Sequence, residues 1–468
     1  MDRLNVARPG QVRLTAVRRA AGRLAATLPQ LDGKLLMDEA SLDRAADDFG
    51  HLVHRRPLAV LVPRTGDDVV RMILFARRQG IKIGPRGQAK SAFGQAQVED
   101  GVVIKMGSLD RPPSFAPGRV EVSAGMTWRQ VLAATLERGL RPPMLAQTTY
   151  LSVGGTLAFG GIDGGSFRGG ALVDSVLELQ VVTGAGRLET CSPTRQPELF
   201  EATLAGMGQC GIILRATLPL VPAETHVRSF VLLYRELAAL LADERGPVFD
   251  GRFDRAIGYA MPSASGGWTY YLLAARNFTH PELPDEEAIL AGLGHVHGFE
   301  RSSSLSYFAS TGLGRGTGVG GWLHGSVGLP HPWLAVMVPA AVIQEYAAQV
   351  LSVLKPSARE LDFLVEFHRL NTGLCRRPLF RLPQGPDVFL VVILGTLADP
   401  AAAMETLERN RRFFERARQF GGTLIPAGAV PLSPQDWREH YGPVWESFEA
   451  AKRRFDPDKI LSPGPGIF

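Results

Sequence analysis

The stretch LSVGGTLAFGGIDGGSFRGG occupies residues 151–170, and eight of its 20 residues are glycine. Two shorter glycine-rich stretches, GPRGQAKSAFGQAQ at 84–97 and GMGQCGI at 206–212, lie before and after it in the chain. Glycine lets backbone N–H groups approach a phosphate or a flat ring, because no Cβ stands in the way. Each stretch alone is typical of tight turns, which are more common than cofactor sites. Together, in one predicted domain, they indicate a candidate cofactor site.

The first glycine-rich stretch follows a predicted strand–helix–strand unit. Leu58–Val62 has the composition of a short buried strand, and Thr65 stands three residues before Asp68, a spacing that predicts a capped helix start. Gly80 ends that helix, and Ile81–Ile83 is the next predicted strand. The other elements predicted for this half of the chain are strands at 102–105, 119–123 and 212–218, helices at 127–138 and 197–205, and a hairpin over 177–190.

The second half of the chain alternates predicted strands with long helices. We expect an antiparallel sheet with helices on one face, so the predicted fold class is α+β. The strands are expected at 229–234, 332–338 and 387–395, and the helices at 340–354 and 401–420.

These elements divide the chain into four parts. Residues 1–49 form an N-terminal segment with an amphipathic helix over 12–28, residues 50–222 a first domain, residues 223–430 a second domain and residues 431–468 a C-terminal segment. The last segment ends in FDPDKILSPGPGIF. Free tails rarely carry Phe and Ile, so we expect this end to be packed against the rest of the protein.

The composition excludes several classes of protein. Of the 468 residues, 45% are hydrophobic and 21% are charged, which is typical of globular domains and not of disordered chains. Three cysteines supply neither a disulfide framework nor a four-thiolate zinc site. The arginines are dispersed along the chain, so no nucleic-acid surface is expected. No apolar run approaches the about 20 residues of a membrane span, and the Arg-rich N-terminus lacks the apolar core of a secretory signal. The predicted location is the cytoplasm.

Two histidines, His295 and His297, stand in the sequence GHVHGF at 294–299. Two histidines with no third ligand nearby are more often part of a polar turn than of a metal site. We therefore expect no metal centre in this protein.

Several sequence blocks, in one order along the chain, resemble the vanillyl-alcohol-oxidase-type flavoproteins and, within them, the cytokinin dehydrogenases. The resemblance implies a PCMH-type FAD-binding domain of two α+β subdomains over 50–222, an α+β substrate (cap) domain over 223–430, and a C-terminal segment that returns to the FAD domain. The blocks are RGQAKSAFGQAQ at 86–97, YLSVGGTLAFGGI at 150–162, SFRGG at 166–170, LELQVVTGAG at 177–186, GMGQCGII at 206–213, PHPWLAVMVP at 330–339 and FDPDKILSPGPGIF at 455–468.

The resemblance also implies which residues hold FAD. Backbone and hydroxyl contacts of the first stretch would hold the pyrophosphate, and the second stretch would line the cofactor on its other side. The third stretch would border the adenine or ribityl part, and two C-terminal positions would return to the flavin. The residues so implied are Arg86, Gly87, Gln88, Ala89, Lys90, Ser91, Gln95, Ser152, Gly154, Gly155, Ala158, Ile162, Gly211, Ile213, Ser462 and Pro465.

One departure from the family pattern concerns the attachment of the flavin. Cytokinin dehydrogenases carry GRGHS, whose His bonds covalently to the flavin, whereas this chain reads GQAKS, with Lys90 at the His position and Ala89 at a Gly position. A lysine amine has a reference pKa of about 10.4, so it is protonated at neutral pH and is a poor nucleophile. We therefore expect non-covalent FAD. Lys90 either places a cation near the dimethylbenzene edge of the flavin or extends into solvent at the pocket rim.

A second departure concerns the catalytic base. The family has W-T-D-Y-L before the VGGT block, and alignment without gaps places Gln147 at the Asp that takes the proton of the substrate amine. An amide is not a useful proton acceptor at neutral pH, although it can hydrogen-bond a substrate. The candidates for a substitute base are Asp163, Tyr150, Glu366 and His368. Asp163 is favoured by its place in the glycine-rich stretch, although it could equally cap a turn. Glu366 and His368 alternate on a predicted strand and face either the substrate pocket or solvent.

The predicted function is that of an FAD-dependent oxidoreductase, which oxidises a small molecule by hydride transfer to flavin N5. Because the residues specific for cytokinins are replaced, we expect a tailoring step of bacterial specialised metabolism and not cytokinin cleavage. The alternative is a flavin-binding protein of the same fold with no net redox activity, acting as a cyclase or isomerase or only binding a ligand. The expected partner is a small-molecule substrate, with no nucleic acid and no membrane, and the chain is expected to be a monomer or a homodimer.

Overall fold

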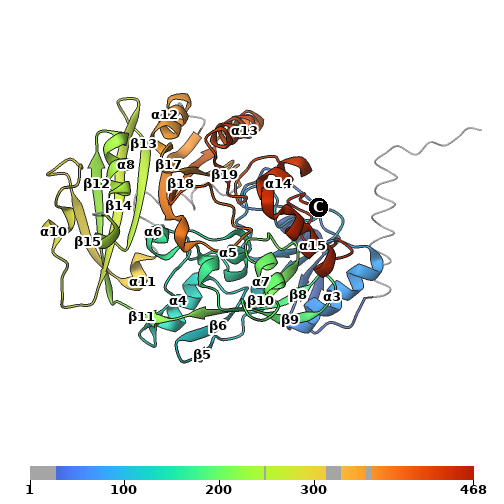
Figure 1. The fold of residues 1–468 in the computed structure, drawn as a ribbon. Coiled ribbons are helices and arrows are strands. Elements are labelled where there is room, and N and C mark those ends of the chain that lie inside the picture. The colour runs from blue at the N-terminus through green and yellow to red at the C-terminus, as the bar shows by residue number, and fades with distance from the viewer. Residues whose placement is uncertain (1–27, 247–248, 312–327, 355–359) are drawn as a thin grey trace, which may run out of the picture.

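The computed structural model describes residues 28–246, 249–311, 328–354 and 360–468. Figure 1 shows a large sheet on one side of the molecule and smaller sheets on the other, with the C-terminal helices over the smaller sheets. The N-terminal helix expected over 12–28 lies, but for its last residue, outside the described residues.

The first subdomain is a four-stranded sheet in the order β1-β2-β4-β3. β1 (Lys34–Leu36) runs antiparallel to β2 (Ala59–Val62), while β2 and β3 (Ile83–Arg86) both run parallel to β4 (Val102–Lys105). β1 lies in residues 1–49, which we expected to form a separate helical segment. Its pairing with β2 makes it part of this sheet instead.

Helix α3 (Gly66–Gln79) packs on this sheet and has the predicted ends. Thr65 and Asp68 form a reciprocal capping box at its start, and Gly80 ends it in the left-handed conformation with φ of +66°. The apolar face of α3 is buried against the strands through Val69, Met72, Ile73, Phe75 and Ala76.

The second subdomain is a five-stranded antiparallel sheet in the order β5-β6-β10-β8-β9. Trp128 is buried, and its indole Nε1 donates to Thr156 Oγ1 at 3.1 Å, which joins two helices of this subdomain. The strands are β5 (Ser114–Ala116), β6 (Arg119–Ser123), β10 (Gly211–Pro219), β8 (Glu178–Thr183) and β9 (Leu188–Cys191), and the helices are α4 (Trp128–Leu136), α5 (Val153–Phe159) and α7 (Pro197–Thr203).

The cap domain is an eight-stranded antiparallel sheet in the order β15-β12-β14-β13-β17-β18-β16-β19. Helices α8 (Leu237–Arg245), α12 (Ile343–Val353) and α13 (Ala403–Gln419) lie together on one face, as the sequence predicts (Figure 1). The other face meets the FAD domain, where α6 (Ser166–Gly169) packs on β17. The strands are β12 (His226–Tyr234), β13 (Arg255–Pro262), β14 (Trp268–Phe278), β15 (Arg301–Ser306), β16 (Leu334–Pro339), β17 (Glu360–Asn371), β18 (Asp387–Leu397) and β19 (Thr423–Leu424).

The C-terminal segment returns to the first sheet. After α14 (Pro434–Tyr441) and α15 (Trp445–Phe455) the chain runs beside β3, where the N–H of Ile83 donates to the carbonyl of Ile460 and the N–H of Ser462 donates to the carbonyl of Ile83, each at 2.8 Å. The expectation that this end is packed against the rest of the protein is therefore confirmed.

A buried ion pair anchors this C-terminal peptide. Lys452 Nζ lies 2.8 Å from Asp456 Oδ2, and the two side chains are 1% and 0% exposed. Lys452 also donates to the backbone carbonyls of Gln209 and Leu461, and Asp456 accepts from the backbone N–H groups of Ile460 and Leu461. The pair thus ties the third glycine-rich stretch to the C-terminal peptide.

Replacing Lys452 by Ala is expected to lower the free energy of unfolding by about 3–5 kcal/mol, because Asp456 is left buried without its counter-charge. Urea denaturation followed by tryptophan fluorescence measures the change. Arg453→Ala, on the exposed side of the same helix, is the control and is expected to shift the value by less than about 0.5 kcal/mol. Equal denaturation midpoints for the two variants would show that the pair does not anchor the peptide.

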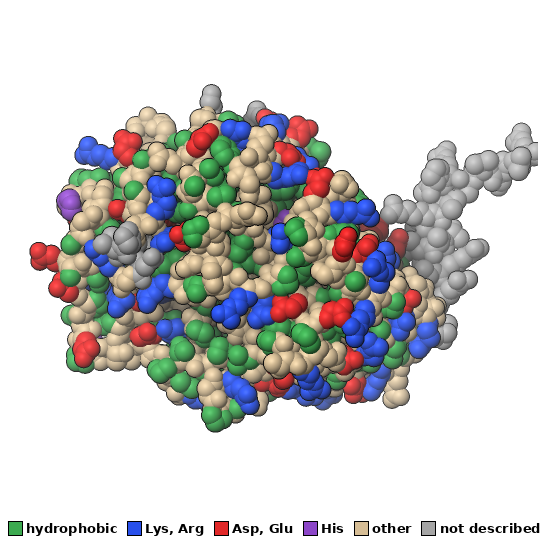
Figure 2. Space-filling view, in the orientation of Figure 1, with side chains coloured by type: hydrophobic (Ala, Val, Ile, Leu, Met, Phe, Trp, Pro, Cys, Tyr) green, Lys and Arg blue, Asp and Glu red, His purple; other side chains and the backbone are tan. Residues whose placement is uncertain are grey.

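The surface carries mixed charge. On the face drawn in Figure 2, basic and acidic side chains are interspersed and do not gather into a basic stripe. None of the helices in the described ranges combines the length and the apolar character that crossing a lipid bilayer requires.

Candidate active site

A cavity of about 350 Å³ opens where four segments of the chain meet. Its walls include residues from each of the three glycine-rich stretches, at 85–91, 151–162 and 207–213, and Ser462 from the C-terminal peptide. The structure thus brings together stretches that lie far apart in the sequence.

At two contacts between these segments, any residue larger than glycine would require a neighbouring serine side chain to move. A Cβ on Gly87 would lie 2.1 Å from Ser152 Oγ, and a Cβ on Gly208 would lie 2.6 Å from Ser462 Oγ. Both distances are far below an ordinary van der Waals contact. The first contact joins the first and second glycine-rich stretches, and the second joins the third stretch to the C-terminal peptide.

Three of the eight non-glycine residues that have a positive φ in the described part of the chain line this cavity. Ala89, Met207 and Ser462 line it with φ of +55°, +52° and +50°. Residues other than glycine are uncommon in this left-handed region and cluster at binding sites. Ala89 stands where the resemblance implies glycine, and its backbone keeps the conformation that glycine favours.

The chemical character of the cavity fits FAD. Among the described residues that line it, Arg86 and Lys90 carry charge, both of them cations, and no carboxylate does. The remaining wall is built of small, hydroxyl-bearing and apolar residues. A diphosphate needs cations and backbone N–H groups, and a flavin ring needs a flat apolar slot. All of the FAD-binding residues that the sequence predicts, except Pro465, line this cavity.

Two of these side chains already bind partners within the protein. Ser91 Oγ donates to Asp48 Oδ2 at 2.8 Å, and Asp48 also accepts from the N–H of Gly94. Burial raises the pKa of Asp48, and these hydrogen bonds oppose that rise. The Arg86 guanidinium donates to backbone carbonyls at the end of α2 (Glu39–Ala45). These side chains therefore hold the first glycine-rich stretch in its conformation, and a ligand would be bound by the backbone N–H groups of that stretch.

Lys90 lies at the rim of the cavity. Its side chain is exposed, its Nζ lies 4.6 Å from the centroid of the Phe49 ring, and partial desolvation lowers its pKa. The ammonium group is therefore held over an aromatic ring and is not directed freely into solvent.

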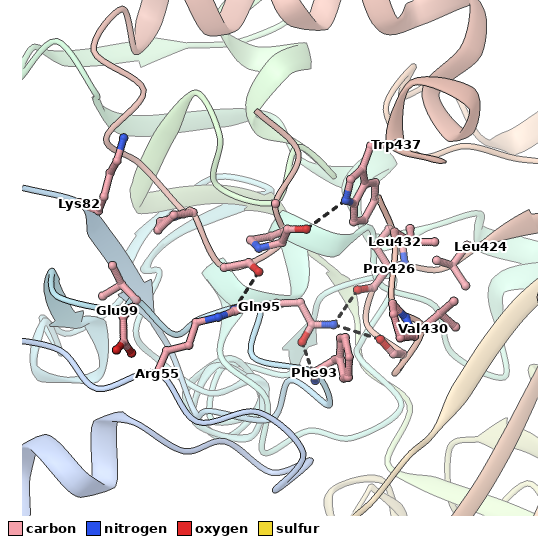
Figure 3. Close-up of a pocket in the computed structure, with 17 residues that line it drawn as sticks. Arg55, Lys82, Phe93, Gln95, Glu99, Leu424, Pro426, Val430, Leu432 and Trp437 are labelled. Carbon is pink, nitrogen blue, oxygen red and sulfur yellow. Dashed lines mark hydrogen bonds between the residues drawn. The ribbon is translucent and has the colours of Figure 1, made fainter. Parts of the chain in front are cut away.

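Pro465 lies outside this cavity and lines a second one, of about 390 Å³ (Figure 3). Its carbonyl accepts a hydrogen bond from Trp437 Nε1 at 3.0 Å, which holds it there. Gln95 lines both cavities, and its Nε2 donates to the carbonyl of Pro426 at 3.0 Å. The position of Pro465 does not support the flavin contact that the resemblance implies; Ser462 makes the return to the FAD cavity instead.

Three predicted site residues from different domains lie in one chain of contacts that begins at the FAD cavity; Gln147 lines the cavity, whereas Glu366 and His368 do not. The Nε2 of Gln147 lies 3.5 Å from both carboxylate oxygens of Glu366. Glu366 Oε2 lies 2.9 Å from His368 Nε2, and the two side chains are 9% and 1% exposed. Both side chains are buried and do not face solvent, and neither of them lines the cavity itself.

The strand register explains this orientation. Glu366 on β17 lies opposite Tyr259 on β13, and His368 lies opposite Leu390 on β18. Directly opposed residues share one face of a sheet, and Leu390 lines the FAD cavity. Burial raises the pKa of Tyr259 far above its ordinary value, and the nearby Glu366 adds to that rise, so Tyr259 is a neutral phenol that donates to Glu366.

The other two candidate bases lie elsewhere. Asp163 Oδ1 accepts from the N–H of Gly165 at 2.7 Å, which is the turn-capping role, and burial raises its pKa. The ring of Tyr150 lies 5.6 Å from Arg129 Cζ. Neither residue lines the FAD cavity. Their positions do not support the preference for Asp163.

Sequence reasoning missed several residues of the cavity wall. They are apolar, they come from both domains, and no motif marks them. Tyr259 was also missed, although the alternation of its strand could have placed it on the inner face. The missed wall residues include Met106, Ala124, Phe380, Leu390 and Ile425.

Matches with known proteins follow the same division of the chain. Residues 57–192 match an FAD binding domain family, and residues 226–468 match the family described as cytokinin dehydrogenase 1, FAD and cytokinin binding. Cytokinin dehydrogenase 4 of Arabidopsis thaliana is 30% identical over 487 residues, which cover 93% of this chain and 92% of that protein. The chain belongs to the cytokinin dehydrogenase family of FAD-dependent oxidoreductases.

A second relative and a solved structure are also similar to this chain. A Rhodococcoides fascians protein named "uncharacterized oxidoreductase ORF5 in fasciation locus" is 35% identical over 434 residues, which cover 91% of this chain and 97% of that protein. The crystal structure of 6-hydroxy-D-nicotine oxidase from Arthrobacter nicotinovorans superposes with a TM-score of 0.73 over 93% of this chain and 97% of that one. At 17% identity this likeness shows the PCMH-type fold alone.

Proposed function

We propose that this oxidoreductase holds FAD without a covalent bond and oxidises a small-molecule amine or alcohol. The observation that carries the proposal is the contact between Gln147, which lines the FAD cavity, and the buried Glu366, which does not line it. When bound, FAD accepts a hydride from the substrate at its N5 atom. The chain's own residues are left to orient the substrate and to take its proton.

Gln147 is proposed to orient the substrate. A carboxylate only accepts hydrogen bonds, so the NH₂ group of Gln147 faces Glu366 and its carbonyl oxygen is left for the cavity. A carbonyl oxygen binds an N–H or O–H group of a ligand. We therefore infer that the substrate carries an amine or hydroxyl group on the carbon that is oxidised.

Glu366 is proposed to take the proton. Oxidation of a neutral amine or alcohol to a neutral imine or carbonyl product removes a hydride from the carbon and a proton from the neighbouring N–H or O–H. The amide of Gln147 cannot hold that proton, whereas the carboxylate that it contacts can. His368, 2.9 Å from Glu366, shares the added proton and holds the carboxylate in place.

The proposed substrate is not a cytokinin but an intermediate of bacterial specialised metabolism. Gln147 stands in place of the family's catalytic Asp. The cytokinin dehydrogenases that this chain resembles carry a Tyr beside the flavin where this chain has small residues at 427–429; Ala427 lines the cavity, and we infer a wider pocket. The cytoplasmic location and the oligomeric state, monomer or homodimer, stay predictions.

The test is anaerobic reduction of the bound flavin. Secondary amines and alcohols are screened for bleaching of the visible flavin absorbance, with a cytokinin as the comparison and dithionite as the positive control. We expect one amine or alcohol class to bleach the flavin and the cytokinin to leave it oxidised. If only dithionite bleached it, a cyclase, an isomerase or a ligand-binding protein would be favoured.

The flavin is expected to stay in solution when the protein is precipitated with acid. Lys90 replaces the histidine that forms the covalent bond in the family, and an ammonium group is a poor nucleophile. The yellow colour should remain in the supernatant, and the mass of the denatured chain should equal its sequence mass. A fluorescent pellet together with a mass increase of one flavin would contradict non-covalent binding and would make Lys90 the residue to replace next.

A further inference from the structure

A cluster of three metal-binding side chains lies in the cap domain, away from the FAD cavity. The loop between α10 (Glu286–Leu290) and β15 carries His295, His297 and Glu300. Figure 1 shows α10 and β15 at the edge of the cap sheet, on the side away from α5. The sequence-based expectation of a polar turn assumed that no third ligand lies nearby; Glu300, three residues after His297, supplies one.

The three donor atoms are spaced as zinc ligands are. His295 Nε2 lies 2.9 Å and His297 Nδ1 lies 3.5 Å from Glu300 Oε1, and the three ligand atoms all lie within 4.8 Å of one another. Two ligands about 2.0–2.1 Å from a tetrahedral Zn²⁺ are about 3.3 Å apart. The two distances to Glu300 Oε1 are therefore within a few tenths of an ångström of the spacing between zinc ligands.

The loop is held in place by the rest of the domain. The N–H of Val296 donates to the carbonyl of Leu233 on β12 at 2.7 Å, and the N–H of Gly294 donates to Asp243 Oδ2 at 2.8 Å. The ring of His295 packs edge-to-face on Tyr234, and its side chain is 1% exposed. The arrangement of the ligands is therefore largely preformed.

Solvent reaches the cluster from one side. The side chain of His297 is 79% exposed and that of Glu300 is 26% exposed. An ion can enter from solvent and keep water as its fourth ligand.

We propose that His295, His297 and Glu300 form a Zn²⁺ site that fastens the α10–β15 loop to the cap sheet. Two imidazole nitrogens select against Mg²⁺ and Ca²⁺, which prefer oxygen ligands, and two imidazoles with one carboxylate and one open position are a known zinc ligand set. The site is independent of the flavin chemistry.

Isothermal titration of the full-length FAD-loaded protein with ZnCl₂ tests the proposal. One Zn²⁺ is expected to bind per chain, to raise the midpoint of thermal unfolding, and to bind at least tenfold more weakly in His297→Gln and in Glu300→Gln. MgCl₂ is expected to produce no binding. Both substituted side chains reach solvent, so the variants are expected to fold and to keep their flavin absorbance.

His54→Gln is the matched control. This exposed histidine also faces a carboxylate, with His54 Nε2 3.3 Å from Asp47 Oδ1, and its replacement is expected to leave Zn²⁺ binding unchanged. The proposal is overturned if Zn²⁺ does not bind, if His297→Gln and Glu300→Gln bind it as the unchanged protein does, or if His54→Gln abolishes binding.

Discussion

A Gly155→Asp variant is expected to purify without FAD and to take up added FAD at least a hundredfold more weakly than the unchanged protein. Gly155 lines the cavity and is exposed to it, and a Cβ there would already lie 2.8 Å from Ser152 Oγ. The added carboxylate would enter a wall that has no other acidic group among its described residues and would repel a diphosphate. Placing an unpaired charge in such a site costs several kcal/mol, and about 3 kcal/mol corresponds to a hundredfold.

The measurement is the ratio of flavin to protein absorbance, followed by fluorescence titration with FAD. Gly251→Asp is the matched control, because a Cβ on Gly251 meets nothing within 4 Å and the residue is exposed. That variant is expected to keep its flavin. Normal flavin content in Gly155→Asp would mean that FAD does not bind at this cavity.

Replacing Glu366 by Gln is expected to slow anaerobic flavin reduction by the identified substrate roughly 10²–10⁴-fold, because the proton loses its acceptor. Glutamine keeps the size of the side chain and its contacts with Gln147 and His368. Flavin content and reduction by dithionite should be unchanged. The pH dependence of the reduction rate, which reports the base, should also change in shape.

Two further variants separate chemistry from packing. Glu345→Gln, exposed on α12, should reduce its flavin at the normal rate. Tyr259→Phe removes one hydrogen bond to Glu366 and should have a smaller effect than Glu366→Gln. A Glu366→Gln variant that reduced its flavin at the normal rate would exclude Glu366 as the base.

Local signals in the sequence predicted local structure well. The capping box of Thr65 and Asp68 and the left-handed Gly80 depend on residues a few positions apart, so the bounds of α3 could be predicted closely. The alternation of Glu366 and His368 predicted that they share a face of their strand. Which face it is depends on the pairing of β17 with β13 and β18, and the sequence of one strand does not contain that information.

The parts of the site that were missed depend on contacts between distant segments. Asp48 holds the first glycine-rich stretch through Ser91 and Gly94, more than 40 residues later, and no motif surrounds it. Glu300 is different, because its spacing from His295 and His297 is visible in the sequence.

The C-terminal peptide has a consequence for how the holoenzyme matures. Lys82 donates to the carbonyl of Lys459 across 377 residues, and Ser462 completes one wall of the cavity. While the chain is still being synthesised on the ribosome, the glycine-rich stretches have emerged but this wall has not. We therefore expect nascent chains that are stalled before Lys459 to hold no flavin. In that case FAD binds only after the C-terminal peptide has been synthesised and has packed beside β3.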